Sequence, residues 1–136
     1  MKIKIDEVDL MPIRAHSTDA GLDLRAGNSA WVLEGKSVIF DTKVHVELPK
    51  GTCGLIISRS GLNVKHGLIC TGLIDEGYTG EIKVRLFNFG DYDFYIHEGD
   101  RIAQLVVIPC IYEAVEIADE LEASERGNNG FGSTGR

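Results

Sequence analysis

The chain of 136 residues has only three cysteines, three prolines and a single tryptophan. Cys53, Cys70 and Cys110 are odd in number, lie far apart and match no zinc-binding spacing, so they predict reduced thiols in apolar core positions. No apolar run approaches the length of a membrane span, and the N-terminus lacks the apolar core of a signal peptide. The sequence therefore predicts a cytoplasmic protein that does not contact a membrane.

Positive charge is scarce and is missing from a long stretch near the C-terminus. The chain has 14 Lys and Arg against 21 Asp and Glu, a net charge of −7, which argues against a nonspecific nucleic-acid binder. An anionic small ligand would need local arginines, backbone donors or a bridging metal. No Lys or Arg lies between Arg101 and Arg126, and the acidic run 113–125 is typical of a solvated face or a linker.

Most of the chain, whose length suits one domain, is predicted to form short strands. The segments with strand patterns are KSVIFDTKVHVELPKG (36–51), CGLIIS (53–58), EIKVRLFNFG (81–90) and RIAQLVVIP (101–109). Glycine-marked turns separate them, which indicates an all-β sandwich, barrel or jelly roll. Two segments have helical composition, RSGLNVKHG (59–67) and EAVEIADELEA (113–123).

The C-terminal segment 126–136 contains four of the 16 glycines, with one phenylalanine and an arginine at each end. Residues 130–135 match G-x-G-x-x-G, but a dinucleotide-binding turn needs a strand before it and a helix after it. The lack of a following lysine also excludes a Walker A loop. Composition alone favours a disordered terminus, although the backbone N–H groups, hydroxyls, Arg126 and the ring would suit an anionic nucleotide.

Several polar residues lie where predicted strands meet turns, and each has a structural alternative. Asp23 and Asp75 would serve as turn caps if taken singly, and Arg101 as a structural ion pair with its neighbour Asp100. For Tyr78, a core ring with its hydroxyl at the surface is as well supported as a functional role. A further polar residue in a predicted strand, Gln104, could satisfy a buried backbone group. The four histidines show no ligand spacing and are assigned to the surface or the core.

Taken in order, five patches resemble the five motifs of the trimeric deoxyuridine triphosphatases (dUTPases). The patches are DAGLDLRA (19–26), SRSGLNVKHG (58–67), GLIDEGYTGEI (72–82), GDRIAQL (99–105) and RGNNGFGSTG (126–135). They cover almost the whole chain at the approximate spacings of the family, and the third and fifth are the most specific. Ser58 departs from the pattern, since the family often has proline there, which affects only the local loop geometry.

The resemblance implies a distorted jelly-roll β-barrel with one short helix as a single catalytic domain, residues 1–125. Residues 126–136 would form a flexible arm that closes over the active site. The run 113–125 would carry this arm to a neighbouring subunit as an extended strand and connector up to about Ile117, although its composition is helical. The conformation of residues 118–125 stays open. The implied assembly is a homotrimer with shared active sites, and the implied cofactor is Mg²⁺.

The implied reaction is hydrolysis of dUTP to dUMP and pyrophosphate, which limits dUTP and supplies dUMP for thymidylate synthesis. Catalysis is expected of Asp75, which would activate the attacking water, and of Gln104 at the phosphates. Asp23 would contact the magnesium ion through water, while the triphosphate mainly holds the ion. The residues expected to bind substrate are Arg59, Ser60, Gly61, Gly72, Ile74, Tyr78, Arg126, Phe131, Gly132, Ser133 and Thr134.

The individual substrate contacts implied by the resemblance differ in kind. Tyr78 would lie beneath the deoxyribose and leave no room for a ribose 2′-hydroxyl. Backbone groups of residues 68–72 would contact the uracil edge, and Phe131 would stack on the base. Arg126, with the hydroxyls of Ser133 and Thr134, would bind the γ-phosphate.

Two alternatives belong to other functional classes. The dCTP deaminases share the fold, but they need a glutamate acting on cytosine, and these patches match the hydrolase pattern. A noncatalytic binding protein is disfavoured because all five patches are intact. A regulatory protein partner in addition to catalysis stays open.

Overall fold

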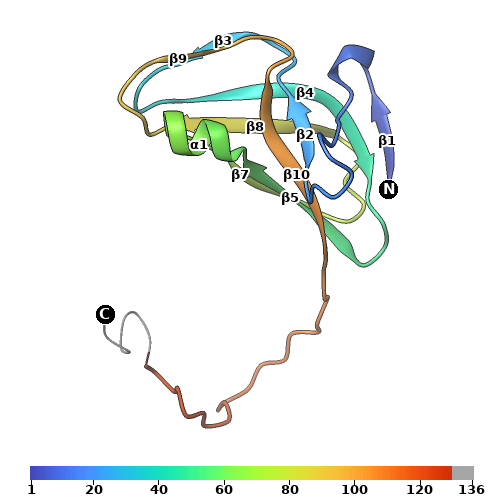
Figure 1. Cartoon of the computed structure of the whole chain (residues 1–136). Helices are drawn as coiled ribbons and strands as arrows, with labels where there is room; N and C mark the ends of the chain where they lie inside the picture. Colours follow the sequence, from blue (N-terminus) through green and yellow to red (C-terminus); the bar gives the residue numbers. More distant parts are fainter. Residues whose placement is uncertain (130–136) are drawn as a thin grey trace.

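Two four-stranded antiparallel sheets make up most of the protein, here a computed structural model that describes residues 1–129 (Figure 1). The first contains, in spatial order, β1 (Lys2–Ile5), β4 (Ser37–Glu47), β8 (Glu81–Asn88) and β6 (Leu68–Ile69). The second contains β2 (Leu22–Arg25), β10 (Arg101–Pro109), β5 (Thr52–Ser58) and β7 (Thr71–Ile74). Each sheet combines strands from distant parts of the chain, and the predicted all-β fold is confirmed.

The predicted closure into a barrel is wrong for the described residues. Their pairings give two separate four-stranded sheets and a third, two-stranded one, whereas a barrel needs continuous pairing around its wall. The edge strand β6 has only two residues, Leu68 and Ile69. The edges of the two sheets are β1 and β6 in the first and β2 and β7 in the second, and within residues 1–129 no pairing joins an edge of one sheet to an edge of the other. The arrangement is consistent with a jelly roll.

Alternating apolar residues explain why the strands form. In β8, Ile82, Val84 and Leu86 are buried, while the intervening Lys83 and Arg85 are exposed, as expected for a strand with one face on the core. The same core includes apolar residues of all the longer strands. Its largest fully buried side chains are Phe40, Leu24, Leu68, Ile82, Leu86, Ile96, Ile102 and Leu105.

Two of the three cysteines occupy the predicted core positions. Cys53 and Cys70 are buried, Cys110 is partly exposed, and all three thiols are free. Burial raises the pKa of both the Cys53 and the Cys70 thiol. These two thiols therefore stay protonated and act as small apolar groups.

The predicted helix at 59–67 is present as α1 (Ser60–His66). It ends at Gly67, which adopts a left-handed conformation with φ 66° and donates its N–H to the carbonyls of Asn63 and Leu62. A Cβ atom at Gly67 would lie 2.5 Å from the nitrogen of Gly90. Glycine is therefore required here by both backbone conformation and space, and the turn fixes how α1 passes into β6.

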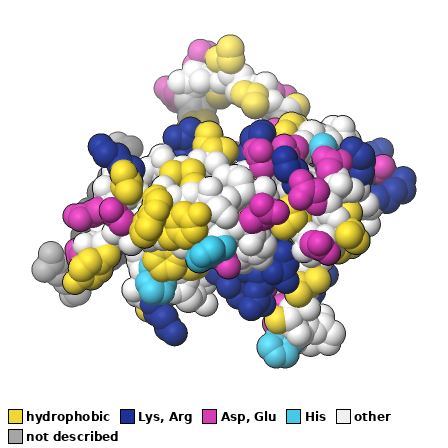
Figure 2. All heavy atoms as spheres, turned by 90° about the horizontal axis from the view of Figure 1, so that it is seen from above, with side chains coloured by type: hydrophobic (Ala, Val, Ile, Leu, Met, Phe, Trp, Pro, Cys, Tyr) yellow, Lys and Arg dark blue, Asp and Glu magenta, His cyan; other side chains and the backbone are white. Residues whose placement is uncertain are grey.

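The third sheet pairs β3 (Ala30–Val32) with β9 (Phe94–Ile96) at the upper end of the molecule in Figure 1. Its exposed rings form a small group, with Trp31 and Tyr95 centroids 5.0 Å apart and Tyr95 and His97 centroids 4.7 Å apart. Figure 2, which views this end from above, shows hydrophobic side chains gathered next to histidine. A short 3₁₀ turn, η1 (Val8–Leu10), follows β1.

After β10 the chain leaves the folded body as a long tail (Figure 1). Among the described residues, the last hydrogen bond between tail backbone and body backbone runs from the Cys110 N–H to the Gly51 carbonyl at 2.9 Å. Residues 111–129 form neither helix nor strand, and Ile117 and Leu121 are almost fully exposed. No helix forms up to Ile117, in keeping with the expected extended run, but within residues 1–129 this run pairs into no strand either. Tertiary packing supplies most helix stability in proteins, and this exposed run has none.

No helix among residues 1–129 is long and apolar enough to cross a membrane.

Candidate active site

A buried carboxylate brings together three of the five patches. Asp23 lies on β2 and is only 4% exposed. Its Oδ1 accepts a hydrogen bond from Arg59 Nε at 3.0 Å and one from Gln104 Nε2 at 3.3 Å, and its Oδ2 accepts one from Arg101 Nη1 at 3.1 Å. The first, second and fourth patches therefore meet at one point. We call these four residues the Asp23 cluster.

The sheet register explains why the Asp23 cluster forms. Gln104 is directly opposite Asp23 in the pairing of β10 with β2. A register irregularity between Arg101 and Ala103 changes the local direction of β10, as bulges do. On the other side of β10, Ala103 pairs with Ser58, which places the following residue, Arg59, beside Asp23.

The environment of the Asp23 cluster suits a polyanion. Arg59 and Arg101 are partly exposed, with 30% and 38% of their side chains accessible, so their remaining donors can bind phosphate. Ser60 and Gly61 begin α1 next to Arg59, where the backbone N–H groups of a first helical turn have no helical partner. The space above Gly61 is open. The site thus offers side-chain and backbone donors on the same surface.

The structure decides between the alternatives for two of these residues. Arg101 does form an ion pair, but with Asp23 rather than with Asp100 as expected. Asp100 instead accepts a hydrogen bond from the His97 N–H at 2.8 Å. Gln104 contacts the Asp23 carboxylate and not a buried backbone group. The role of Arg101 was missed because its partner is 78 residues away in the sequence.

The third patch forms a turn between β7 and β8, residues 75–80. Asp75 follows β7 directly and is exposed, and its carbonyl accepts a hydrogen bond from the Tyr78 N–H at 3.1 Å. Gly77 has φ 88°. Tyr78 is 45% exposed and donates its hydroxyl to the Glu81 carbonyl at 3.0 Å. It is therefore a surface ring fixed at its hydroxyl, and not a core ring.

The surroundings of Tyr78 explain its orientation. A Cβ atom on Gly80 would come within 2.6 Å of the ring carbon that bears the hydroxyl, so the absence of a side chain at position 80 lets the ring lie flat on the turn. Gly72 and Ile74 lie on β7, which pairs with β5. Three of the residues expected to bind substrate, Gly72, Ile74 and Tyr78, thus occupy β7 and the turn that follows it.

Glu76 anchors the start of the 75–80 turn and was not singled out in the sequence. Its Oε2 accepts hydrogen bonds from the Gly51 N–H at 2.8 Å and from the Tyr112 hydroxyl at 3.0 Å. The turn is therefore tied both to the neighbouring β4–β5 connection and to the first part of the C-terminal tail. Position 76 alone carried no signal, since an acidic residue in a turn is most often solvated.

Within one chain the third patch lies far from the Asp23 cluster. Asp23 is opposite Gln104, Gln104 is opposite Ile57, and Ile57 is opposite Thr71 on β7. Asp75 comes four residues after Thr71. Three strand spacings of about 4.8 Å across the sheet and four residues of about 3.3 Å along it give roughly 20 Å. One chain therefore does not bring Asp75 to the donors of the Asp23 cluster.

The fifth patch lies mostly outside the described residues. Arg126 is exposed and closes a local turn, with Nε donating to the Asn129 carbonyl at 3.1 Å. The predictions for Phe131, Gly132, Ser133 and Thr134 fall beyond residue 129 and stay predictions. The division of the chain at residue 125 stays a prediction as well.

The metal-binding capacity of the described residues is limited. Within residues 1–129 no group of three His, Cys, Asp or Glu side chains could hold a metal ion. Asp23 offers one carboxylate, which already accepts three hydrogen bonds. Such a site suits an ion that brings its own ligands and is not a protein cage.

Comparison with known proteins agrees with this arrangement. A dUTPase family model matches residues 9–135. The chain is 42% identical over 135 residues to the deoxyuridine 5′-triphosphate nucleotidohydrolase of Clostridium acetobutylicum, covering 97% of this chain and 93% of that protein. It is similar in structure to the Staphylococcus bacteriophage 80alpha dUTPase with dUPNHPP, with TM-score 0.91, 31% identity and coverage of 99% of this chain and 98% of that chain.

A further solved structure is a mutant dUTPase from phage phi11 of S. aureus, with TM-score 0.81, 27% identity and coverage of 90% of this chain and 98% of that chain. That structure is described as showing the coordination of a structural Mg(II) ion. The family match spans nearly the whole chain, and the Clostridium relative is of nearly the same length. The chain therefore belongs to the dUTPase family, and its reaction is the hydrolysis of dUTP.

Proposed function

We propose that Asp75 orients and activates the water that attacks the α-phosphorus of dUTP, giving dUMP and pyrophosphate. A carboxylate on a turn tied at Glu76 and Tyr78 suits this role, because a general base must be held within hydrogen-bond reach of its water. Tyr78, with its ring on Gly80, would support the deoxyribose and exclude a 2′-hydroxyl. The observation that carries the proposal is the meeting of three patches at the buried Asp23, next to backbone donors that begin α1.

The Asp23 cluster would bind the phosphates. Asp23 fixes the side chains of Arg59, Arg101 and Gln104 before substrate arrives, so their remaining donors are held in a defined arrangement. Such preorganised donors stabilise the charge of a phosphoryl-transfer transition state without reorganisation at the moment of reaction. Ser60 and Gly61 would add backbone donors from the start of α1.

The donor set also fits magnesium as the cofactor. Mg²⁺ keeps several waters and is commonly held by one or two carboxylates together with substrate phosphates. A carboxylate has about four lone-pair sites, so the three hydrogen bonds on Asp23 leave one site for a water on the ion. When bound, the ion would offset the charge of the triphosphate, which a chain of net charge −7 would otherwise repel. The Mg(II) ion described for the phi11 enzyme supports this choice.

Substrate selectivity tests the function. Pyrophosphate release with Mg²⁺ is expected from dUTP, with kcat/KM at least about a hundredfold lower for dTTP, dCTP and UTP. Rejection of dTTP tests whether the backbone of residues 68–72, expected at the uracil edge, excludes a 5-methyl group. Rejection of UTP tests the role of Tyr78. Ammonia release from dCTP would indicate deaminase chemistry, and equal turnover of UTP would contradict the proposed sugar contact.

We further propose a homotrimer whose active sites combine groups from different subunits. The separation of roughly 20 Å between Asp75 and Asp23 supports this arrangement, because both must act on one triphosphate and the sheet holds them apart. The exposed tail after Cys110 is long enough to leave its own subunit. A second copy would therefore complete each site, and the arm of a neighbour would close it.

Complementation between inactive variants tests the shared site. Asp75→Asn and Arg59→Ala would each inactivate a homotrimer, but in different halves of the site. When equal amounts are unfolded and refolded together, about a quarter of the sites would combine an intact Asp75 with an intact Arg59 from another chain. We expect about a quarter of wild-type activity. If both residues acted within one chain, the mixture would stay as inactive as its components.

A protein partner that responds to nucleotide is a second candidate function. The similar phage 80alpha enzyme comes from work describing phage dUTPases as controlling the transfer of virulence genes by a G protein-like mechanism. In such a role the dUTP-bound and free states would bind a partner differently. The discriminating measurement is partner affinity with and without the imido analogue of dUTP.

A further inference from the structure

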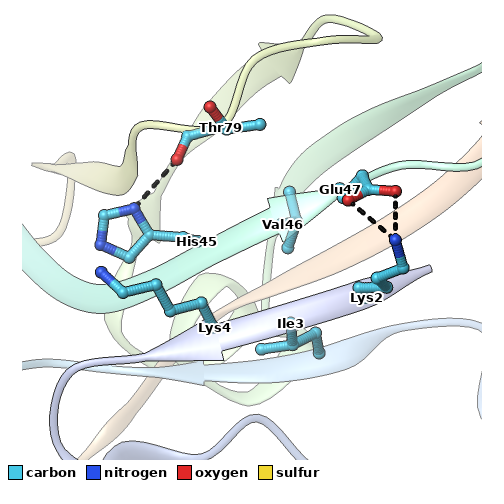
Figure 3. Close-up of a pocket in the computed structure, with 7 residues that line it drawn as sticks. All are labelled: Lys2, Ile3, Lys4, His45, Val46, Glu47 and Thr79. Atoms are coloured by element: carbon cyan, nitrogen blue, oxygen red, sulfur yellow. Dashed lines mark hydrogen bonds and ion pairs between the residues drawn. The ribbon is translucent and has the colours of Figure 1, made fainter.

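His45 joins the end of the 75–80 turn to the segment after β1. Its Nδ1 lies 3.0 Å from the Thr79 carbonyl oxygen and its Nε2 lies 3.0 Å from Asp6 Oδ2. Figure 3 shows the ring extending from β4 toward Thr79, with Lys4 of β1 alongside. Neither a carbonyl nor an ionised carboxylate can donate a hydrogen bond. Both ring nitrogens must therefore donate, which requires the doubly protonated imidazolium.

An irregular backbone aims His45 at the turn. The pairing of β4 with β8 shifts register between Asp41 and His45, and Lys43 between them has φ 59°. This left-handed conformation is costly for a residue with a side chain and persists only where its surroundings hold it. Here the Lys43 N–H donates to Glu81 Oε1 at 2.9 Å, and the Lys43 carbonyl accepts from the Asp6 N–H at 3.0 Å. Those contacts fix the bulge from both sides.

The charges around His45 favour its protonated form. Asp6 faces the ring from the segment after β1, and Lys4 on β1 shares that carboxylate at 2.9 Å. Glu81 lies opposite on β8, although its carboxylate is engaged with the Lys43 N–H and with Lys83. The hydrogen bond to Asp6, and after it the one to the Thr79 carbonyl, raises the pKa of His45, while partial burial and the charge of Lys4 oppose this shift with smaller effects.

We propose that His45 is a positioning residue for dUTP hydrolysis: its imidazolium, held by Asp6, fixes the Thr79 carbonyl and so keeps Asp75 and Tyr78 in their working positions. The inference rests on the proposed roles of Asp75 and Tyr78. Glu76 anchors one end of the 75–80 turn and His45 the other. Sequence patterns assigned His45 no role, because the contact depends on a bulge that no local pattern reveals.

Loss of the proton would release one particular contact. A neutral imidazole keeps a single N–H, and the charge-assisted hydrogen bond to the Asp6 carboxylate is the stronger of the two. The proton therefore stays on Nε2, and Nδ1 then presents a lone pair to the Thr79 oxygen. His45 thus holds the turn at pH values below its raised pKa, and the hold is lost as the pH rises through that value. Asp6 keeps its charge throughout this range, because hydrogen bonds from Lys4 and His45 lower its pKa.

The test compares pH profiles of dUTP hydrolysis between about pH 5.5 and about pH 9. For the wild-type enzyme we expect kcat/KM to fall up to about tenfold at the alkaline side of the histidine titration, the effect of one lost hydrogen bond. His45→Arg can donate to both acceptors at every pH and should remove this fall. Asp6→Asn keeps His45 but removes the carboxylate that raises its pKa and holds the last proton on Nε2, and should therefore shift the fall to lower pH or abolish it.

Controls separate this role from a general structural one. His97→Gln removes an exposed histidine that also has a carboxylate partner, Asp100 at 3.6 Å, and should leave the profile unchanged. Imidazole ¹⁵N spectra of the full-length enzyme should show both nitrogens of His45 protonated at pH values below the fall in kcat/KM, and Nδ1 deprotonated above it. The amide signals of Thr79 and Gly80 should shift over the same pH range. Profiles of the same shape in the wild type, His45→Arg and Asp6→Asn would overturn the inference.

The spectra also separate this inference from the proposed function. If Asp75 were not the base, Asp75→Asn would retain turnover whatever the state of His45. If His45 did not hold the turn, Asp75→Asn would still be inactive, but the Thr79 amide would not follow the His45 titration. If His45→Arg fails to fold, Asp6→Asn still tests whether His45 holds the 75–80 turn, because it leaves the His45 imidazole in place.

Discussion

Replacing Asp75 by asparagine is expected to lower kcat for dUTP by a factor of about 10² to 10⁴, the range that a positioned general base contributes. The amide has the same shape as the carboxylate, so the turn and its Tyr78 N–H contact should persist. It cannot accept a proton from the attacking water. The measurement is pyrophosphate release at saturating dUTP, with calorimetric binding of the imido analogue to show that the site still takes nucleotide.

A matched control for the Asp75 variant is Asp91→Asn, which makes the same chemical change at an exposed position in the β8–β9 connection. It should turn over dUTP like the wild type. If Asp75→Asn lost both analogue binding and turnover, the residue would be assigned to substrate binding and not to proton transfer. Turnover within a fewfold of wild type would remove Asp75 from the mechanism altogether.

The strands and the short helix could be predicted because they depend on local signals. Alternation at Ile82, Val84 and Leu86 has period two, and Gly67 provides the left-handed end of α1. The functional residues were found by a different route, through resemblance of the patches to a family. The residues themselves supported only turn caps and ion pairs, since the chemistry of each depends on partners far away in the sequence.

What could not be predicted depends on register and on irregular backbone. Arg101 precedes a shift in the pairing of β10 with β2, so its partner is Asp23 and not the adjacent Asp100. His45 follows the bulge at Lys43, which alters the direction of the following side chains. Neither shift has a signature in composition or periodicity. Barrel closure was predicted wrongly for a related reason, because it depends on pairing between the edge strands of the two sheets, which no local pattern reveals.

Deleting residues 126–136 is expected to leave a folded enzyme with kcat/KM for dUTP lowered by about 10²-fold or more. The fold should persist because, within residues 1–129, the hydrogen bonds of residues 126–129 all lead to residues 124–129. The loss of activity should be large because the arm would supply Arg126 to the γ-phosphate and Phe131 to the uracil. A charge-assisted hydrogen bond contributes about 1.5–3 kcal/mol and base stacking about 1–3 kcal/mol.

Point variants in the arm distinguish ligand contacts from simple coverage of the site. Arg126→Ala and Phe131→Ala should each lose part of the effect of the deletion on activity, whereas Asn128→Ala, at a neighbouring polar residue with no assigned contact, should change little. Thermal unfolding at equal protein concentration should give the same midpoint for the truncated and full-length chains, because the Cys110 hydrogen bond to the body lies well before the cut. A truncated chain that unfolds or dissociates would make the arm a structural element. Full activity after truncation would mean that the site closes without it, and the glycine-rich segment would then have no part in catalysis.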